Sequence, residues 1–474
     1  MKRSTLCSGI LALSLCLLFT PVPGHGVTWE LTRLRENLGG IPAELTNVDG
    51  TVFFAVRNPS SFFPSSRLWK TDGSPSGTVM VKDVDPGNDG LIASLTNVNG
   101  TLFFVATDAS HGRELWKSDG TEAGTVLVKD IYPGGNSNPD WLTNVNGTLF
   151  FKADDGTHGS ELWKSDGTEA GTVMVKDVIV PDLPSFGIDP GWLTNVNDVL
   201  FFSAKKEGWS GDELWRSDGT AAGTRLIKDI NPGSDGSTPM YLKAIGSLLF
   251  FSADDGTHGK ELWKSDGTEA GTELVKDIWF DSVDSEPKEI TQYGFSVMFS
   301  ATREDQGREL WTSIAGLEAS TMMVKDIADH YLHPDSNPEY LTENKAMLYF
   351  AAYSFYAGGR ELWKSNGTAT GTVMVKDIHP SGDSNPEHLT SSNGYVFFTA
   401  DDGVHGEELW VSDGTAAGTA MVRDIDPTDG SNPKNLLDVN GTLYFFASGI
   451  EWELWKCEEE FPWILFYPAM IHRE

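Results

Sequence analysis

Nine positions of the chain carry side chains that could bind a ligand, and each lies directly before a leucine or isoleucine in a repeated sequence. Aromatic rings stack on sugars or on peptide side chains, and carboxylates bind cations or transfer protons. The position varies where its surroundings repeat, which indicates a binding role for a glycan or an extended peptide; the alternative is that these side chains fill a channel. In chain order the nine residues are Glu44, Ser94, Trp141, Trp192, Tyr241, Glu289, Tyr340, His388 and Asn435.

The two acidic members, Glu44 and Glu289, are the candidates for catalysis. A hydrolase or lyase acting on polysaccharide needs paired carboxylates close together, whereas these two belong to the first and the sixth repeat. No nucleophile elbow, phosphate loop or zinc signature is present. We therefore expect a binding or adhesion scaffold that is not an enzyme, with a polysaccharide hydrolase or lyase as the alternative.

Three acidic loops are compatible with calcium, because Ca²⁺ takes six to eight oxygen ligands. Their spacing matches no known calcium loop, and the formation of a turn alone explains Asp followed by Gly. We therefore expect no cofactor, with Ca²⁺ as the alternative. The loops contain Asp154-Asp155, Asp254-Asp255 and Asp401-Asp402, followed by His158, His258 and His405.

These positions belong to a repeat that occurs nine times. Eight copies contain Glu-Leu-Trp and the first contains Arg67-Leu68-Trp69, with successive Trp residues 45 to 52 positions apart. Most copies continue as Ser-Asp-Gly-Thr-x-x-Gly-Thr, as in residues 118–125. On these motifs the chain resembles the bacterial ELWxxDGT-repeat family, over nearly all of its length after residue 26. The resemblance implies a secreted repeat protein and says little about its ligand.

Each repeat reads as four short strands. In residues 140–178 the strands are separated by Asn146-Gly147, a strong hairpin signal, then by an Asp-Gly loop and the Asp-Gly-Thr turn. The second strand is apolar on both faces, so it must be covered on both faces, as happens when blades stack around an axis. We predict a closed all-β propeller of about nine four-stranded blades; eight blades or two smaller propellers are the alternatives.

The chain ends support closure of the ring. The last repeat lacks its fourth strand, and residues 29–35 at the other end have the right spacing to supply it. Closure removes exposed strand edges. Within the motif, we expect Asp, Gly and Thr to build the turn, and each Glu to pair with a Lys of the fourth strand, as Glu114 with Lys129. The longer connections fall at the end of the blades where the first strand of each repeat starts, beside the nine variable positions. This predicts a functional face at that end.

Bulk properties limit the partners. The net charge is −33, and it becomes −35 without residues 1–26, which hold two basic and no acidic residues. Such a charge excludes nucleic acid and anionic membranes as expected partners, and no later segment is long enough to insert into a membrane. Residues 1–26 read as a signal peptide, so we expect a secreted or cell-surface bacterial protein. The propeller would span residues 27–456, and an atypical tail would span residues 457–474.

Overall fold

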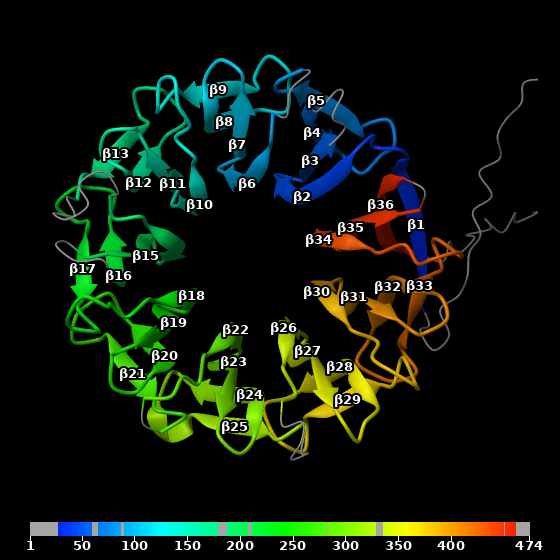
Figure 1. Cartoon of the computed structure of the whole chain (residues 1–474). Helices are drawn as coiled ribbons and strands as arrows, with labels where there is room; N and C mark the ends of the chain where they lie inside the picture. The colour runs from blue at the N-terminus through cyan, green and yellow to red at the C-terminus, as the bar shows by residue number, and fades with distance from the viewer. Residues whose placement is uncertain are drawn as a thin grey trace, which may run out of the picture.

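The structure is a computed structural model that describes residues 27–58, 65–86, 90–178, 187–206, 211–280, 282–328, 335–449 and 451–460. The predicted signal peptide and residues 461–474 of the predicted tail lie outside the described residues. The 36 strands form nine antiparallel sheets of four strands, arranged around a common axis (Figure 1). The prediction of a nine-bladed propeller is therefore confirmed, and the alternatives of eight blades or two propellers are excluded.

Each blade is built in the same order from the axis outward. The innermost strands are β2 (Ile41–Val48), β6 (Ala93–Val98), β10 (Asp140–Val145), β14 (Gly191–Val196), β18 (Met240–Ile245), β22 (Lys288–Tyr293), β26 (Glu339–Asn344), β30 (Glu387–Ser392) and β34 (Lys434–Val439). The second strands are β3 (Thr51–Asn58), β7 (Thr101–Asp108), β11 (Thr148–Asp154), β15 (Val199–Lys205), β19 (Leu248–Asp254), β23 (Ser296–Arg303), β27 (Met347–Ser354), β31 (Tyr395–Asp401) and β35 (Thr442–Ser448).

The outer half of each blade contains the motif. The third strands are β4 (Ser65–Thr71), β8 (Gly112–Ser118), β12 (Ser160–Ser165), β16 (Asp212–Ser217), β20 (Lys260–Ser265), β24 (Gly307–Ile314), β28 (Gly359–Ser365), β32 (Glu407–Ser412) and β36 (Trp452–Glu460). The outermost strands are β5 (Val79–Asp83), β9 (Val126–Lys129), β13 (Val173–Lys176), β17 (Arg225–Lys228), β21 (Glu273–Lys276), β25 (Met322–Lys325), β29 (Val373–Lys376), β33 (Thr419–Arg423) and, in blade nine, β1 (Thr28–Arg35). A single turn of 3₁₀ helix, η1 (Glu318–Ser320), is the only helix among the described residues.

The two ends of the described chain close the ring. Strand β1 pairs antiparallel with β36, with Leu31 opposite Cys457, so the N-terminal strand completes blade nine as predicted. Trp29 and Leu31 are buried in the core shared with blade eight, and Leu34 in the core shared with blade one. Because β36 runs to Glu460, the expected boundary between propeller and tail at residue 456 falls inside this strand.

Separate apolar cores lie between neighbouring blades. Leu115 and Trp116 of blade two point to opposite faces, so Leu115 packs against blade three and Trp116 against blade one. Both faces of the second strand are covered, and Phe104 and Phe151 are fully buried. Burying one such side chain contributes about 1.5–3 kcal/mol. The core therefore explains why the repeat keeps Leu, Trp and Phe.

The Asp-Gly-Thr motif builds the turn between the third and fourth strands, as expected. In blade two, Asp119 Oδ1 accepts hydrogen bonds from the backbone N–H and the hydroxyl of Thr121, both 2.8 Å long. Ser118 and Thr125 join their hydroxyls across the buried base of the turn at 2.7 Å. Lys117 then donates to the carbonyl of Gly167 in the next blade, 2.8 Å away, so the turn also connects blades.

The predicted Glu–Lys pair across the two outer strands is wrong. Trp116 pairs with Leu127 as expected, but a bulge between Leu115 and Trp116 places Leu115, not Glu114, opposite Lys129. A shift of one residue turns each side chain to the other face of the strand. Glu114 is buried and accepts hydrogen bonds from Ser137, while Lys129 donates to a carbonyl of the next blade.

Candidate ligand-binding ring

The nine variable positions all lie on the innermost strands and share one unusual backbone conformation. At each of them the strand contains a bulge; in blade three, for example, the pairing shifts between Asp140 and Thr143, which places Trp141 in the bulge. All nine have φ between 54° and 59°, in the left-handed region. We call these nine residues the binding ring: Glu44, Ser94, Trp141, Trp192, Tyr241, Glu289, Tyr340, His388 and Asn435.

Left-handed backbone costs a residue other than glycine about 1–2 kcal/mol. Glycine would avoid this cost, yet none of the nine positions is glycine. A strained conformation that recurs with large and varied side chains indicates that the side chains themselves are needed. Seven of the nine residues belong to types that do not favour a positive φ, and only Asn435 and His388 belong to types enriched there, so this conformation could not be predicted from the residue types.

A threonine two residues after the ring position holds several of the bulges in place. Thr143 donates its hydroxyl to the carbonyl of Trp141 at 2.9 Å, and the same hydroxyl lies 3.2 Å from the carbonyl of Leu193 in the next blade. The same two contacts occur at Thr194, Thr291 and Thr342. Sequence reasoning missed these threonines, although their fixed spacing from the ring position was visible.

Three consecutive blades bring aromatic rings together. The ring centroids of Trp141 and Trp192 are 5.3 Å apart, and those of Trp192 and Tyr241 are 5.2 Å apart. Trp141 keeps 37% of its surface exposed although it belongs to this cluster. These three residues form a contiguous aromatic surface, which we call the aromatic stack.

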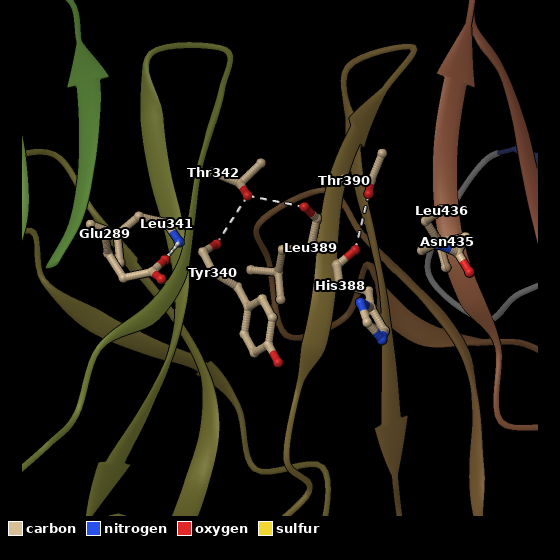
Figure 2. Close-up of a pocket in the computed structure, with 9 residues that line it drawn as sticks. All are labelled: Glu289, Tyr340, Leu341, Thr342, His388, Leu389, Thr390, Asn435 and Leu436. Atoms are coloured by element: carbon tan, nitrogen blue, oxygen red, sulfur yellow. Dashed lines mark hydrogen bonds between the residues drawn. The ribbon is translucent and has the colours of Figure 1, made fainter. Parts of the chain in front are cut away.

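The other half of the ring forms a pocket of about 280 Å³ between blades six and nine. Glu289, Tyr340, His388 and Asn435 line it (Figure 2), together with Leu341, Thr342, Leu389, Thr390 and Leu436. Tyr340 and His388 extend in the same direction from neighbouring strands, with their rings 6.1 Å apart. We call this the polar pocket.

Three carboxylates and one guanidinium act on Tyr340 in the polar pocket. Burial raises the pKa of Tyr340, and the carboxylates of Glu387, Glu339 and Glu289 raise it further, so the phenol stays protonated and can donate a hydrogen bond. Of these three carboxylates, Glu339 forms an ion pair with Arg360 at 2.7 Å. Sequence reasoning did not single out Glu339 and Glu387, which directly precede ring residues.

Glu44 and Glu289 do not come together. They lie on blades one and six, and each binds its neighbouring blade: Glu44 Oε2 accepts the N–H of Leu95 at 2.8 Å, and Glu289 Oε2 accepts that of Leu341 at 3.3 Å. They therefore cannot act as a pair of acid and base on one bond.

The acidic loops use their carboxylates to hold their own turns. Asp155 Oδ1 accepts the backbone N–H groups of Thr157 and His158, and its Oδ2 lies 2.8 Å from His158 Nδ1. This hydrogen bond raises the pKa of His158. Asp255 and Asp402 make the same contacts. In the part of the chain that the structure describes, no group of three or more His, Cys, Asp or Glu residues is arranged to hold a metal ion.

None of the described segments forms a helix long and apolar enough to cross a membrane. No family model matches the sequence, and no curated protein matches it.

Solved structures do match. A prolyl endopeptidase shares 12% identity at a TM-score of 0.41 over 80% of this chain and 55% of its own. A puromycin-hydrolysing peptidase of Mycobacterium tuberculosis shares 9% identity at a TM-score of 0.41, over 86% of this chain and 57% of its own. The β-propeller domain of the trilobed protease from Pyrococcus furiosus shares 10% identity at a TM-score of 0.37, over 83% of this chain and 98% of its own. The chain thus spans little more than half the length of the two full peptidases.

These matches concern the fold, but they correct the expectation that the chain is not an enzyme. The solved structures named above are peptidases or a domain of a protease. Part of each full peptidase lies outside the match. The expectation that the chain is not an enzyme is accordingly withdrawn.

Proposed function

We propose that this propeller is an extracellular protein that binds a glycan chain across the binding ring. The observation that carries the proposal is the strained backbone of the ring: nine non-glycine residues have a positive φ, and three of them form the aromatic stack. Aromatic faces in such a surface stack on the apolar faces of sugar rings. The glycan would lie on the aromatic stack and continue toward the polar pocket.

The inner edge of the blades favours a glycan over an extended peptide. A peptide that adds to a sheet as a further strand needs free backbone groups at the edge. Here the carbonyls of Leu95, Leu193 and Leu389 already lie within hydrogen-bond distance of threonine hydroxyls of the preceding blade, at 3.3, 3.2 and 3.1 Å. Recognition therefore falls to the side chains of the ring, which suits stacking on sugars.

Trp141→Ala combined with Trp192→Ala tests the proposal. Each aromatic contact contributes about 0.5–1.5 kcal/mol, so the double variant should bind an array-selected glycan about tenfold or more weakly, as measured by isothermal titration calorimetry. Phe295→Ala is the matched control, since Phe295 is 95% exposed in the turn between β22 and β23, at the other end of the blade.

Equal affinities of the double variant and the wild-type protein would contradict the proposal. A glycan array on which the protein binds nothing would also contradict it, above all if the protein then bound an extended peptide. An equal loss in Phe295→Ala would show that the effect does not come from the ring.

A further inference from the structure

The polar pocket differs from the aromatic stack in containing a carboxylate, Glu289, that forms no ion pair among the described residues. Glu289 lines the pocket, and the one hydrogen bond to its carboxylate among the described residues comes from the backbone N–H of Leu341, at 3.3 Å. Glu387 directly precedes His388 and contributes to the negative field at Tyr340. A carboxylate that faces a pocket with a single neutral donor attracts a cation.

The basic side chains around the pocket are already engaged. Arg360 pairs with Glu339 at 2.7 Å, and Arg308 and Lys288 both pair with Glu286, at 3.2 and 3.5 Å. The ammonium of Lys434 lies 5.2 Å from the centre of the Trp452 ring. Each of these cations thus has a partner other than Glu289, and Glu289 forms no ion pair among the described residues.

The lining of the pocket suits an organic cation better than a metal ion. A hard cation such as Ca²⁺ takes six to eight oxygen ligands, whereas this pocket offers one carboxylate beside Tyr340, His388 and an amide from Asn435. An ammonium group needs less: one carboxylate, a few hydrogen-bond acceptors and an aromatic face over which it can lie. The phenol of Tyr340 provides the face, and the Asn435 side chain provides an acceptor.

This step rests on the proposed glycan-binding function. We infer that the polar pocket binds a protonated amino group of the glycan, so that the ligand is an amino-sugar chain with unacetylated amines. The aromatic stack would hold sugar rings of any charge, and Glu289 would select the charged ones. The acidity of the whole protein, with a net charge of −33, also favours a cationic ligand through long-range attraction.

The experiment compares two probes of equal length, a glucosamine hexamer and an N-acetylglucosamine hexamer. They are titrated calorimetrically at a pH at which the amines are protonated. The wild-type protein should bind the glucosamine hexamer about tenfold more tightly or better, and added salt should reduce this preference, because salt screens exposed charges.

Glu289→Gln should abolish the preference without affecting the N-acetylglucosamine hexamer, since the glutamine oxygen can still accept the N–H of Leu341. Glu269→Gln is the matched control: Glu269 is exposed in the turn between β20 and β21, outside the binding ring, so this variant removes one negative charge but should keep the preference. Equal binding of both hexamers, or a preference that survives in Glu289→Gln, would overturn the inference.

Failure of the inference can be separated from failure of the proposed function. If the array finds only neutral or acidic glycans and their binding depends on Trp141 and Trp192, the charge selection is wrong and the glycan function stands. If no glycan binds at all, both fail.

Discussion

The protonation of Glu309 should control the stability of blade six. Its carboxyl group is fully buried; Oε2 accepts hydrogen bonds from Ile327 N–H at 2.9 Å and from the Ser336 hydroxyl at 2.7 Å. Burial raises its pKa to about 8. The structure can hold the proton, because the Ser336 hydroxyl also lies 3.2 Å from the carbonyl of Arg308. The Ser336 hydroxyl can therefore donate to the carbonyl of Arg308 and accept a hydrogen bond from the protonated carboxyl of Glu309.

The magnitude follows from the two pKa values. The pKa is about 8 in the folded protein against 4.5 for the free side chain, which at about 1.4 kcal/mol per pH unit corresponds to about 5 kcal/mol. The folded state keeps its proton to a higher pH than the unfolded chain does. The contribution of Glu309 to the free energy of unfolding is therefore fully present below pH 4.5 and is lost as the pH rises through 8.

Glu309→Gln removes this pH dependence and adds a constant cost. A glutamine cannot ionise, and its NH₂ group cannot accept a backbone N–H where Oε2 does. One buried donor is then left without a partner, which costs about 1–3 kcal/mol. The variant should be less stable than the wild-type protein at about pH 5, and this difference should shrink and change sign by about pH 9.

Urea unfolding at a series of pH values, followed by tryptophan fluorescence, measures the difference. Glu453→Gln is the control, because Glu453 occupies the same motif position in blade nine but pairs with Arg33 at 2.9 Å. A wild-type stability that stays level or rises between about pH 5 and pH 8, or a difference between Glu309→Gln and wild type that does not change with pH, would refute the reasoning.

Three further outcomes follow from the backbone and the turns. Ser94→Gly should raise the free energy of unfolding by about 0.5–1 kcal/mol, the strain relieved less the entropy of glycine, whereas Ser94→Ala should not; equal effects would contradict the strain. Thr172→Val should cost about 1–3 kcal/mol in the same urea assay, because its buried hydroxyl loses its contacts with Ser165 Oγ and Thr168 O, both at 2.7 Å; an unchanged midpoint would contradict this. Removing residues 27–35 should leave the outer edge of β36 unpaired and produce oligomers on size-exclusion chromatography, and a monomeric truncated chain would show that closure is dispensable.

The large features of the fold could be predicted because each has its own residue pattern. The spacing of the Trp residues set the number of blades, the apolar second strands required cover on both faces, and the missing last strand pointed to residues 29–35. These are repeated signals, so one misread copy would not have changed the result.

Two features of the site could not be predicted, because both depend on bulges. The register shift at Leu115 and Trp116 moves Lys129 away from Glu114, and no residue type in the motif predicts it. The bulge at the ring positions gives Trp141 and Tyr340 a positive φ that their residue types disfavour. The sequence could name the ring residues, but not which of them form the aromatic stack and which the polar pocket.

Closure by β1 has a consequence for the order in which the protein can become complete. Leu31 pairs with Cys457, so β1, the first described strand to be synthesised, cannot pair until β36, the last one, has been made. Until β36 has been made, Trp29 and Leu31 have no apolar surface of blade nine to cover them, although both are buried in the finished ring. The last step of assembly is therefore the docking of the two chain ends. A chain whose synthesis stops early remains an open arc of blades with an exposed apolar face at each end.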